Sequence, residues 1–217
     1  MKNEGLIYRI LGPVVTAIDM KAAMYDVVRV GTEGLMGEVI ELHGDKAVIQ
    51  VYEDTSGIRP GEIVVNTGET LSVSLGPGLL TQIYDGIQRP LPTLEKEMGV
   101  FLTRGVDADA FDLEKIWTFE PQVSVGDTIV GGQVVGHVQE TDTIVHKIMA
   151  VPGAGGVVKS IESGDFNVTQ TICTFEDGSD MPMMQKWPVR PPRPYQQKYP
   201  PVLPLITRTR LLDFLFH

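Results

Sequence analysis

Between residues 6 and 73, short runs of apolar side chains alternate with clusters of Gly, Pro and Asp. Runs rich in Val, Ile, Leu and Tyr are typical of β-strands, and such clusters are typical of turns. In residues 46–52 every second side chain is apolar, and the turn formers Gly44 and Asp45 lead back to residues 37–42 in a predicted hairpin. The shared face carries Ala47, Ile49 and Val51. Strands connected this closely predict a small barrel, whose closure removes exposed sheet edges.

The strand pattern returns over residues 117–177 and indicates a second β module. The expected strands are residues 122–125, 128–130, 134–138, 144–148, 157–161 and 169–175. One short helix is expected between the two modules, over residues 93–98. Leu91, Leu94 and Met98 are spaced for one helical face, and Thr93 is the candidate N-cap.

Residues 188–204 hold seven prolines. They predict a stiff, extended connector, because proline fixes φ and donates no backbone hydrogen bond. Beyond it, apolar residues are spaced for the start of a packed helix. These residues are Leu211, Leu212, Leu215 and Phe216.

Composition agrees with a globular, mostly β chain. Its 23 Gly and 15 Pro exceed what a helix-rich protein tolerates. A formal net charge of −10 argues against a nucleic-acid partner, which would need clustered Lys and Arg. The single cysteine, Cys173, and the lack of a signal-like start predict a reducing cytosol as the compartment. No apolar run approaches the 18 or so residues of a membrane helix, so any membrane role is expected to come through partner subunits.

Three stretches of the first module resemble the catalytic A subunit of the archaeal and vacuolar rotary ATPases. They are Gly12-Pro13-Val14-Val15, residues 50–57 with Pro60-Gly61-Glu62, and residues 75–80 with 84–91. The second module resembles the insertion that distinguishes the A subunit from F-type catalytic subunits, as well as from the B subunit. Its matching residues are 117–121, 146–149 and 187–190. The resemblance runs from about residue 5 to residue 213.

The resemblance implies a mostly β fold with little helix. Its expected parts are a six-stranded N-terminal β-barrel or crown domain (1–73), a linking region with one helix (74–111), a β-sandwich-like bulge domain that is a non-homologous insertion (112–185), a Pro-rich connector (186–204) and the start of a nucleotide-binding domain (205–217).

The implied parent protein is the catalytic A subunit of an A-type ATP synthase, which couples ATP synthesis or hydrolysis to H⁺ or Na⁺ transport. Its ATP or ADP and Mg²⁺ would be bound beyond His217, so we expect no catalytic, cofactor-binding or metal residue in this chain and no turnover by it alone. The implied partners are the B subunit, in a hexamer of three A and three B subunits, and peripheral stalk subunits that contact the bulge domain. The complex would lie on the cytoplasmic face of the membrane, as a peripheral part. A stand-alone interaction module remains the alternative.

The end of the chain departs from the family pattern Thr-Gly-x-Arg-x-x-Asp-x-x-Phe-Pro. Arg208 stands in place of the Gly, and His217 in place of the Pro. If this turn needs a positive φ, the Cβ of Arg208 strains it.

Two other motifs are near misses. Residues 153–160 resemble a P-loop, but Val158 replaces the second Gly and the segment reads as a strand edge rather than a helix start. The second module also resembles a biotinyl- or lipoyl-carrier domain, yet residues 142–145 lack the modified lysine and Lys147 lies too near Pro152 to replace it. A shared sandwich topology stays open.

The remaining candidates have simpler interpretations. His43, His137, His146 and Cys173 show no pair at the spacing of a structural zinc site. Asp107, Asp109, Asp112 and Glu114 are interpreted as a solvated connector. The PxxP repeats within residues 188–204, with Arg190 and Arg193, match an SH3-type ligand, but a stiff strut between domains explains the same prolines.

Overall fold

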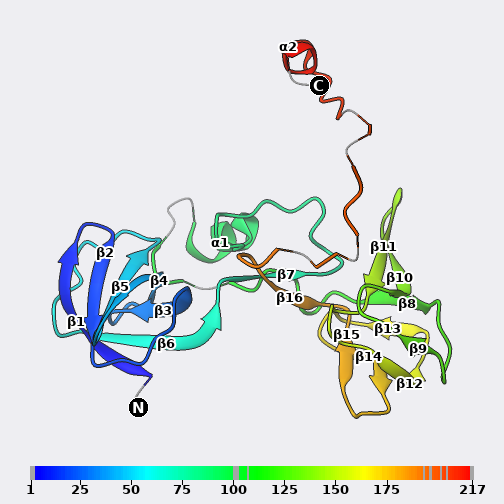
Figure 1. Cartoon of the computed structure of the whole chain (residues 1–217), viewed down its shortest axis with the longest axis horizontal. Helices are drawn as coiled ribbons and strands as arrows, with labels where there is room; N and C mark the ends of the chain where they lie inside the picture. The colour runs from blue at the N-terminus through cyan, green and yellow to red at the C-terminus, as the bar shows by residue number, and fades with distance from the viewer. Residues whose placement is uncertain are drawn as a thin grey trace.

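The computed structural model describes residues 3–99, 103–106, 108–192, 194–195, 197–200, 202–203 and 205–215. The structure is 44% strand and 6% helix, so the prediction of a mostly β protein is confirmed. Figure 1 shows two β domains at opposite ends of the molecule, with the linking region between them.

The N-terminal domain is a closed, antiparallel barrel of six strands, as predicted. Its strands are β1 (Glu4–Leu11), β2 (Val14–Ile18), β3 (Asp26–Val30), β4 (Leu35–His43), β5 (Lys46–Val51) and β6 (Ile63–Thr70), and they close in the order β1-β2-β5-β4-β3-β6. The expected hairpin joins β4 to β5, with His43 paired to Lys46 across the Gly44-Asp45 turn. Alternate side chains point inward, so Val15, Leu35, Ile49 and Val64 are fully buried in the barrel core.

The second domain consists of two four-stranded sheets packed face to face. One sheet has the order β11-β10-β8-β13 and the other β15-β14-β12-β9. The strands are β8 (Trp117–Pro121), β9 (Thr128–Ile129), β10 (Val134–Thr141), β11 (Ile144–Met149), β12 (Gly156–Ile161), β13 (Gly164–Phe166), β14 (Thr171–Phe175) and β15 (Asp180–Pro182). Phe119, Val135, Ile148 and Phe175 form part of a core separate from that of the barrel.

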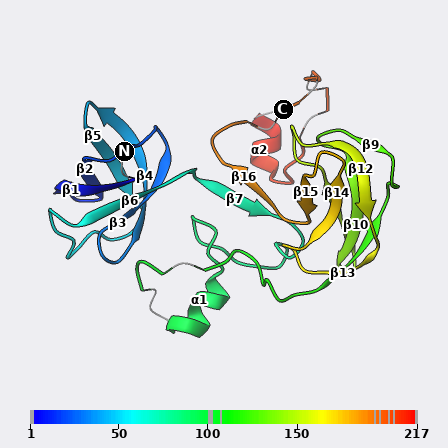
Figure 2. The same ribbon diagram turned by 90° about the horizontal axis from the view of Figure 1, so that it is seen from below.

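A two-stranded ribbon lies between the domains. It pairs β7 (Ser72–Leu75), which follows the barrel, with β16 (Gln185–Pro188), which follows the sandwich. Figure 2 shows the ribbon from a second direction, with helix α1 (Leu91–Met98) set apart from it in the linking region. The outgoing and returning chain therefore lie side by side.

Several details differ from the sequence predictions. The sandwich contains strands β8, β13 and β15, which are absent from the predicted set of strands. Helix α1 begins at Leu91, so Thr93 lies inside it. Its N-cap is Pro90, and no side chain caps the helix; Pro92 lies in the first turn, where the fixed φ of proline suits a helix start. Residues 122–125 form a bend and the start of a turn rather than a strand. The Asp127 side chain stabilises this turn, because it accepts a hydrogen bond from the Ser124 amide at 2.7 Å. The C-terminal helix α2 (Arg210–Leu215) has no buried residue, and Phe216 lies outside the described residues.

Candidate interaction surfaces

An apolar patch covers the outside of two neighbouring barrel strands. It consists of Leu6, Tyr8, Ile63 and Val65, and we call it the outer patch. Leu6 on β1 and Ile63 on β6 are direct cross-strand partners, and their side chains are 43% and 51% exposed. The strand period places Ile7 and Val64, between these residues, in the core. The barrel therefore carries apolar side chains on both sides of this wall.

Strand β4 lies three strands away from β1 in either direction around the barrel. It carries Ile40 and Leu42, which are partly exposed to a similar degree as Val65. This opposite wall offers a comparison for the outer patch in experiments.

The sandwich has its own exposed apolar residues at the edge of one sheet. Strand β9 is the end strand of its sheet. Val125 and Val130 lie before and after it, and each is 62% exposed. A short edge strand flanked by exposed valines is a second candidate contact surface.

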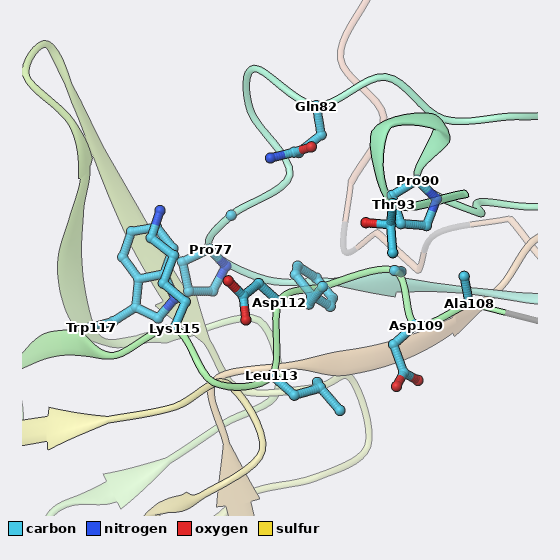
Figure 3. Close-up of a pocket in the computed structure, with 13 residues that line it drawn as sticks. Pro77, Gln82, Pro90, Thr93, Ala108, Asp109, Asp112, Leu113, Lys115 and Trp117 are labelled. Carbon is cyan, nitrogen blue, oxygen red and sulfur yellow. The ribbon is translucent and has the colours of Figure 1, made fainter. Parts of the chain in front are cut away.

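A cavity of about 570 Å³ lies between the linking region and the start of the sandwich. Figure 3 shows Pro77, Lys115 and Trp117 at one end of it, with Thr93 of α1 and the preceding Pro90 at the other. The ammonium group of Lys115 lies 4.1 Å from the ring centre of Trp117. Asp109 and Asp112 also line the cavity, so its described lining has more carboxylates than cations. That balance does not favour a phosphate ligand.

Glu140 of β10 fixes the linking region to the sandwich. One oxygen of its buried carboxylate accepts hydrogen bonds from the amides of Gly78 at 2.7 Å and Leu80 at 3.2 Å, and the other lies 2.9 Å from Nδ1 of His146. Burial raises the pKa of Glu140, but these hydrogen bonds outweigh it, and the pKa is lowered overall. The carboxylate therefore serves as a structural anchor.

The other candidate residues from the sequence are dispersed. His43 lies beside Glu41, His137 beside Glu120, and Cys173 in the sandwich core, where burial raises the pKa of its thiol. Among the described residues, no three His, Cys, Asp or Glu side chains gather as they would around a metal ion. Asp112 accepts a hydrogen bond from the Glu114 amide, whereas Asp107 lies outside the described residues.

The two near-miss motifs lie on strands and a hairpin. Residues 156–160 of the P-loop-like run belong to β12, as the strand interpretation predicted, and Val158 is buried. Residues 142–143, where a carrier domain would present its lysine, form the turn between β10 and β11.

The C-terminal segment is exposed. Arg208 has a φ of 63°, so a Cβ-bearing residue occupies the left-handed conformation where the family pattern has Gly. Leu205, Ile206, Leu211 and Phe214 are all largely exposed. Arg193, Pro201 and Pro204 of the proline-rich motifs, and His217, lie outside the described residues. No helix among the described residues has the length and apolar character needed to cross a bilayer.

Comparisons with known proteins agree with the two-domain arrangement. The family model described as ATP synthase alpha/beta family, beta-barrel domain, matches residues 7–68, and that of the barrel-sandwich domain of ATP synthase alpha/beta subunits matches residues 108–190. The chain is 61% identical over 215 residues to the A subunit of the A-type ATP synthase of Methanocorpusculum labreanum and 57% identical over 216 residues to that of Methanosarcina barkeri. These alignments cover 99% and 100% of this chain. The chain spans 37% of the length of both relatives.

Proposed function

This chain belongs to the ATP synthase alpha/beta family as the N-terminal region of the A subunit of an A-type ATP synthase, and from that premise we propose that it serves assembly rather than catalysis. In the proposal, the barrel holds the parent protein to neighbouring B subunits in an alternating hexamer of three A and three B subunits. The complex lies on the cytoplasmic face of a membrane and couples ATP synthesis or hydrolysis to the transport of H⁺ or Na⁺. ATP or ADP and Mg²⁺ bind in the parent protein, outside these 217 residues.

The outer patch is the observation that supports a lateral contact through the barrel. Leu6 and Ile63 face each other across β1 and β6 on the outside of the barrel, and Tyr8 and Val65 extend the patch along both strands. Contiguous exposed apolar side chains on a globular domain are typical of protein–protein contacts. An aromatic residue such as Tyr8 is common in the buried centre of such contacts.

A second contact, between the sandwich and the peripheral stalk, is proposed on the exposed edge of β9. Val125 and Val130 place apolar side chains on both sides of an end strand. Neither residue belongs to the sandwich core. The two surfaces therefore lie on different domains and can be altered separately.

A crossed binding experiment tests both contacts in the full-length protein. One variant combines Leu6→Thr with Ile63→Thr, and the other combines Val125→Asp with Val130→Asp. Affinities for the B subunit, on one side, and for stalk subunits, on the other, are measured separately by analytical ultracentrifugation. We expect the barrel variant to lose about tenfold or more in affinity for the B subunit, since central apolar contacts contribute most of the binding energy. The barrel variant should bind the stalk subunits with unchanged affinity. The β9 variant should lose affinity for the stalk subunits and keep its affinity for the B subunit.

The matched control combines Ile40→Thr with Leu42→Thr on the opposite barrel wall, where the same change should leave both affinities unaltered. Thermal unfolding of each variant checks that the domains remain folded. A barrel variant that keeps its full affinity for the B subunit would refute the role of the outer patch. Full binding of the stalk by the β9 variant would refute the second contact and leave the first standing.

A further inference from the structure

The barrel and the sandwich have separate cores, and polar contacts join the barrel to the segments outside it. Three arginines from these segments, Arg89, Arg104 and Arg190, each contact a barrel glutamate. The glutamates are Glu53 after β5, Glu33 between β3 and β4, and Glu38 on β4. We call these six residues the arginine joint.

Arg190 makes the contact that spans the most sequence. Its Nε donates to Glu38 Oε1 at 2.7 Å and its Nη2 donates to Glu38 Oε2, across 152 positions of the chain. The Tyr52 hydroxyl donates to the same carboxylate at 3.0 Å, and the guanidinium carbon lies 4.1 Å from the centre of the Tyr25 ring. The Glu38 side chain is 3% exposed, whereas that of Arg190 is 45% exposed. A buried carboxylate on the barrel wall is thus paired by a residue that follows β16.

The hydrogen bonds from Arg190 are the largest influence on Glu38 and, against the effect of burial, keep the pKa of its carboxyl below the ordinary value. A two-pronged guanidinium–carboxylate contact also fixes direction, because both donors lie in one plane. Lysine could not reproduce this geometry. The Arg190 contact is therefore suited to setting an orientation.

Arg104 attaches the linking region at a second place. Its Nε lies 2.6 Å from Glu33 Oε2, its Nη2 donates to Glu33 Oε1 at 3.0 Å, and its Nη1 donates to the carbonyl oxygens of Asp54 and Ser56. The adjacent Gly105 has a φ of 72°, and a Cβ there would lie 2.2 Å from the Glu33 carbonyl oxygen. The glycine lets the linking region lie directly against the barrel.

Arg89 supplies the third attachment. Its Nη1 lies 3.7 Å from Glu53 Oε1 and donates to the Val106 carbonyl oxygen at 2.8 Å, while its Nε donates to Asp85 at 2.7 Å. Glu53 also accepts a hydrogen bond from the Gly105 amide at 2.6 Å. The Arg89 and Glu53 side chains are both largely buried. This contact ties two parts of the linking region to each other and to the barrel.

The linking region is in turn fixed to the sandwich. Glu140 holds the amides of Gly78 and Leu80, and Phe111 packs into the sandwich core. Several attachments at separate places restrict rotation in a way that one contact cannot. A buried ion pair adds little net stability compared with apolar packing, but its partners are costly to separate, so it favours one arrangement over others.

We propose that the arginine joint fixes the orientation of the barrel relative to the sandwich and to the connector after β16, while each domain stays folded without it. Arg190 is the decisive positioning residue, because it holds the start of the connector against the barrel wall. The proposal does not depend on which protein the barrel binds.

The distance between two spin labels tests this orientation in the 217-residue chain. Labels are attached to cysteines introduced as Asp45→Cys in the barrel and Asp142→Cys in the sandwich, both at exposed hairpin turns, in a Cys173→Ala background. Double electron–electron resonance then gives the distribution of distances. We expect one narrow distribution for this parent chain and a clearly broader one for Arg190→Ala. Arg190→Lys should lie between them, since it keeps the charge and loses the second hydrogen bond.

The control is Lys186→Ala, which removes a 3.4 Å contact with Glu69 between side chains that are both about two-thirds exposed. Such a surface pair contributes little, so its loss should leave the distribution narrow. Circular dichroism should show both domains still folded in Arg190→Ala. A narrow distribution in Arg190→Ala, a broad one in the parent chain, or unfolding of the barrel by Arg190→Ala would overturn the proposal.

Discussion

At the scale of single residues, burial and hydrogen bonding around Glu38 also shift the pKa of its neighbour Tyr52. Partial burial and the hydrogen bond to the Glu38 carboxylate raise the pKa of Tyr52 to about 12 from an ordinary 10. The folded chain therefore keeps a proton that the unfolded chain releases near pH 10. The stabilisation from Tyr52 is fully present below pH 10 and is lost as the pH rises toward 12.

Tyr52→Phe should accordingly lower stability at about pH 8, where it removes a hydrogen bond, and should reduce the further loss between about pH 10 and pH 12. Urea unfolding across this range measures the effect. Tyr8→Phe is the control, because Tyr8 lies half-exposed on the outer wall with the ammonium group of Lys46 over its ring. An identical decline with pH in the parent chain and in Tyr52→Phe would contradict the assignment.

At the scale of elements, strands β8 and β10 of the sandwich pack closely because Gly136 of β10 has no side chain. A Cβ on Gly136 of β10 would lie 2.4 Å from the ring of Phe119, which is fully buried on the neighbouring strand β8. A real Cβ cannot occupy that position unless the ring moves. Interior packing leaves little space for such a shift.

Gly136→Ala should therefore destabilise the sandwich by about 2 kcal/mol, the typical cost of overpacking a filled core. Thermal or urea unfolding followed by tryptophan fluorescence measures this change. Gly86→Ala is the matched control, since a Cβ at Gly86 meets no atom within 4 Å. If both variants unfold together with the parent chain, the contact with Phe119 does not constrain the sheet.

At the scale of the whole molecule, the two cores share no residue, and the joint between them is largely polar. We expect calorimetry to resolve two unfolding transitions, because polar contacts couple domains more weakly than a common core does. Ile49→Ala, at a cost of about 3 kcal/mol, should lower only the barrel transition, and Phe119→Ala, at about 4 kcal/mol, only the sandwich transition. A single transition that both variants shift would mean that the domains unfold as one unit.

The sequence by itself determined most of what has a local cause. Apolar residues at every second position around Ile49 predicted β5, because alternate side chains of a strand share a face, and Gly44-Asp45 predicted the turn before it. The family resemblance, which rests on longer motifs, is also confirmed. The limits proposed for each domain stay a prediction, as do the assembly contacts.

Only the tertiary structure decided the contacts between residues far apart in the chain. No local pattern pairs Val73 of β7 with Trp187 of β16, or brings Arg190 to Glu38. In the sequence, Arg190 stands out only within a family motif and a proline-rich motif. Propensity and periodicity act over a few residues, whereas these pairings depend on how two separately folded domains return the chain to one place. The contacts of the arginine joint could therefore be identified only from the tertiary structure.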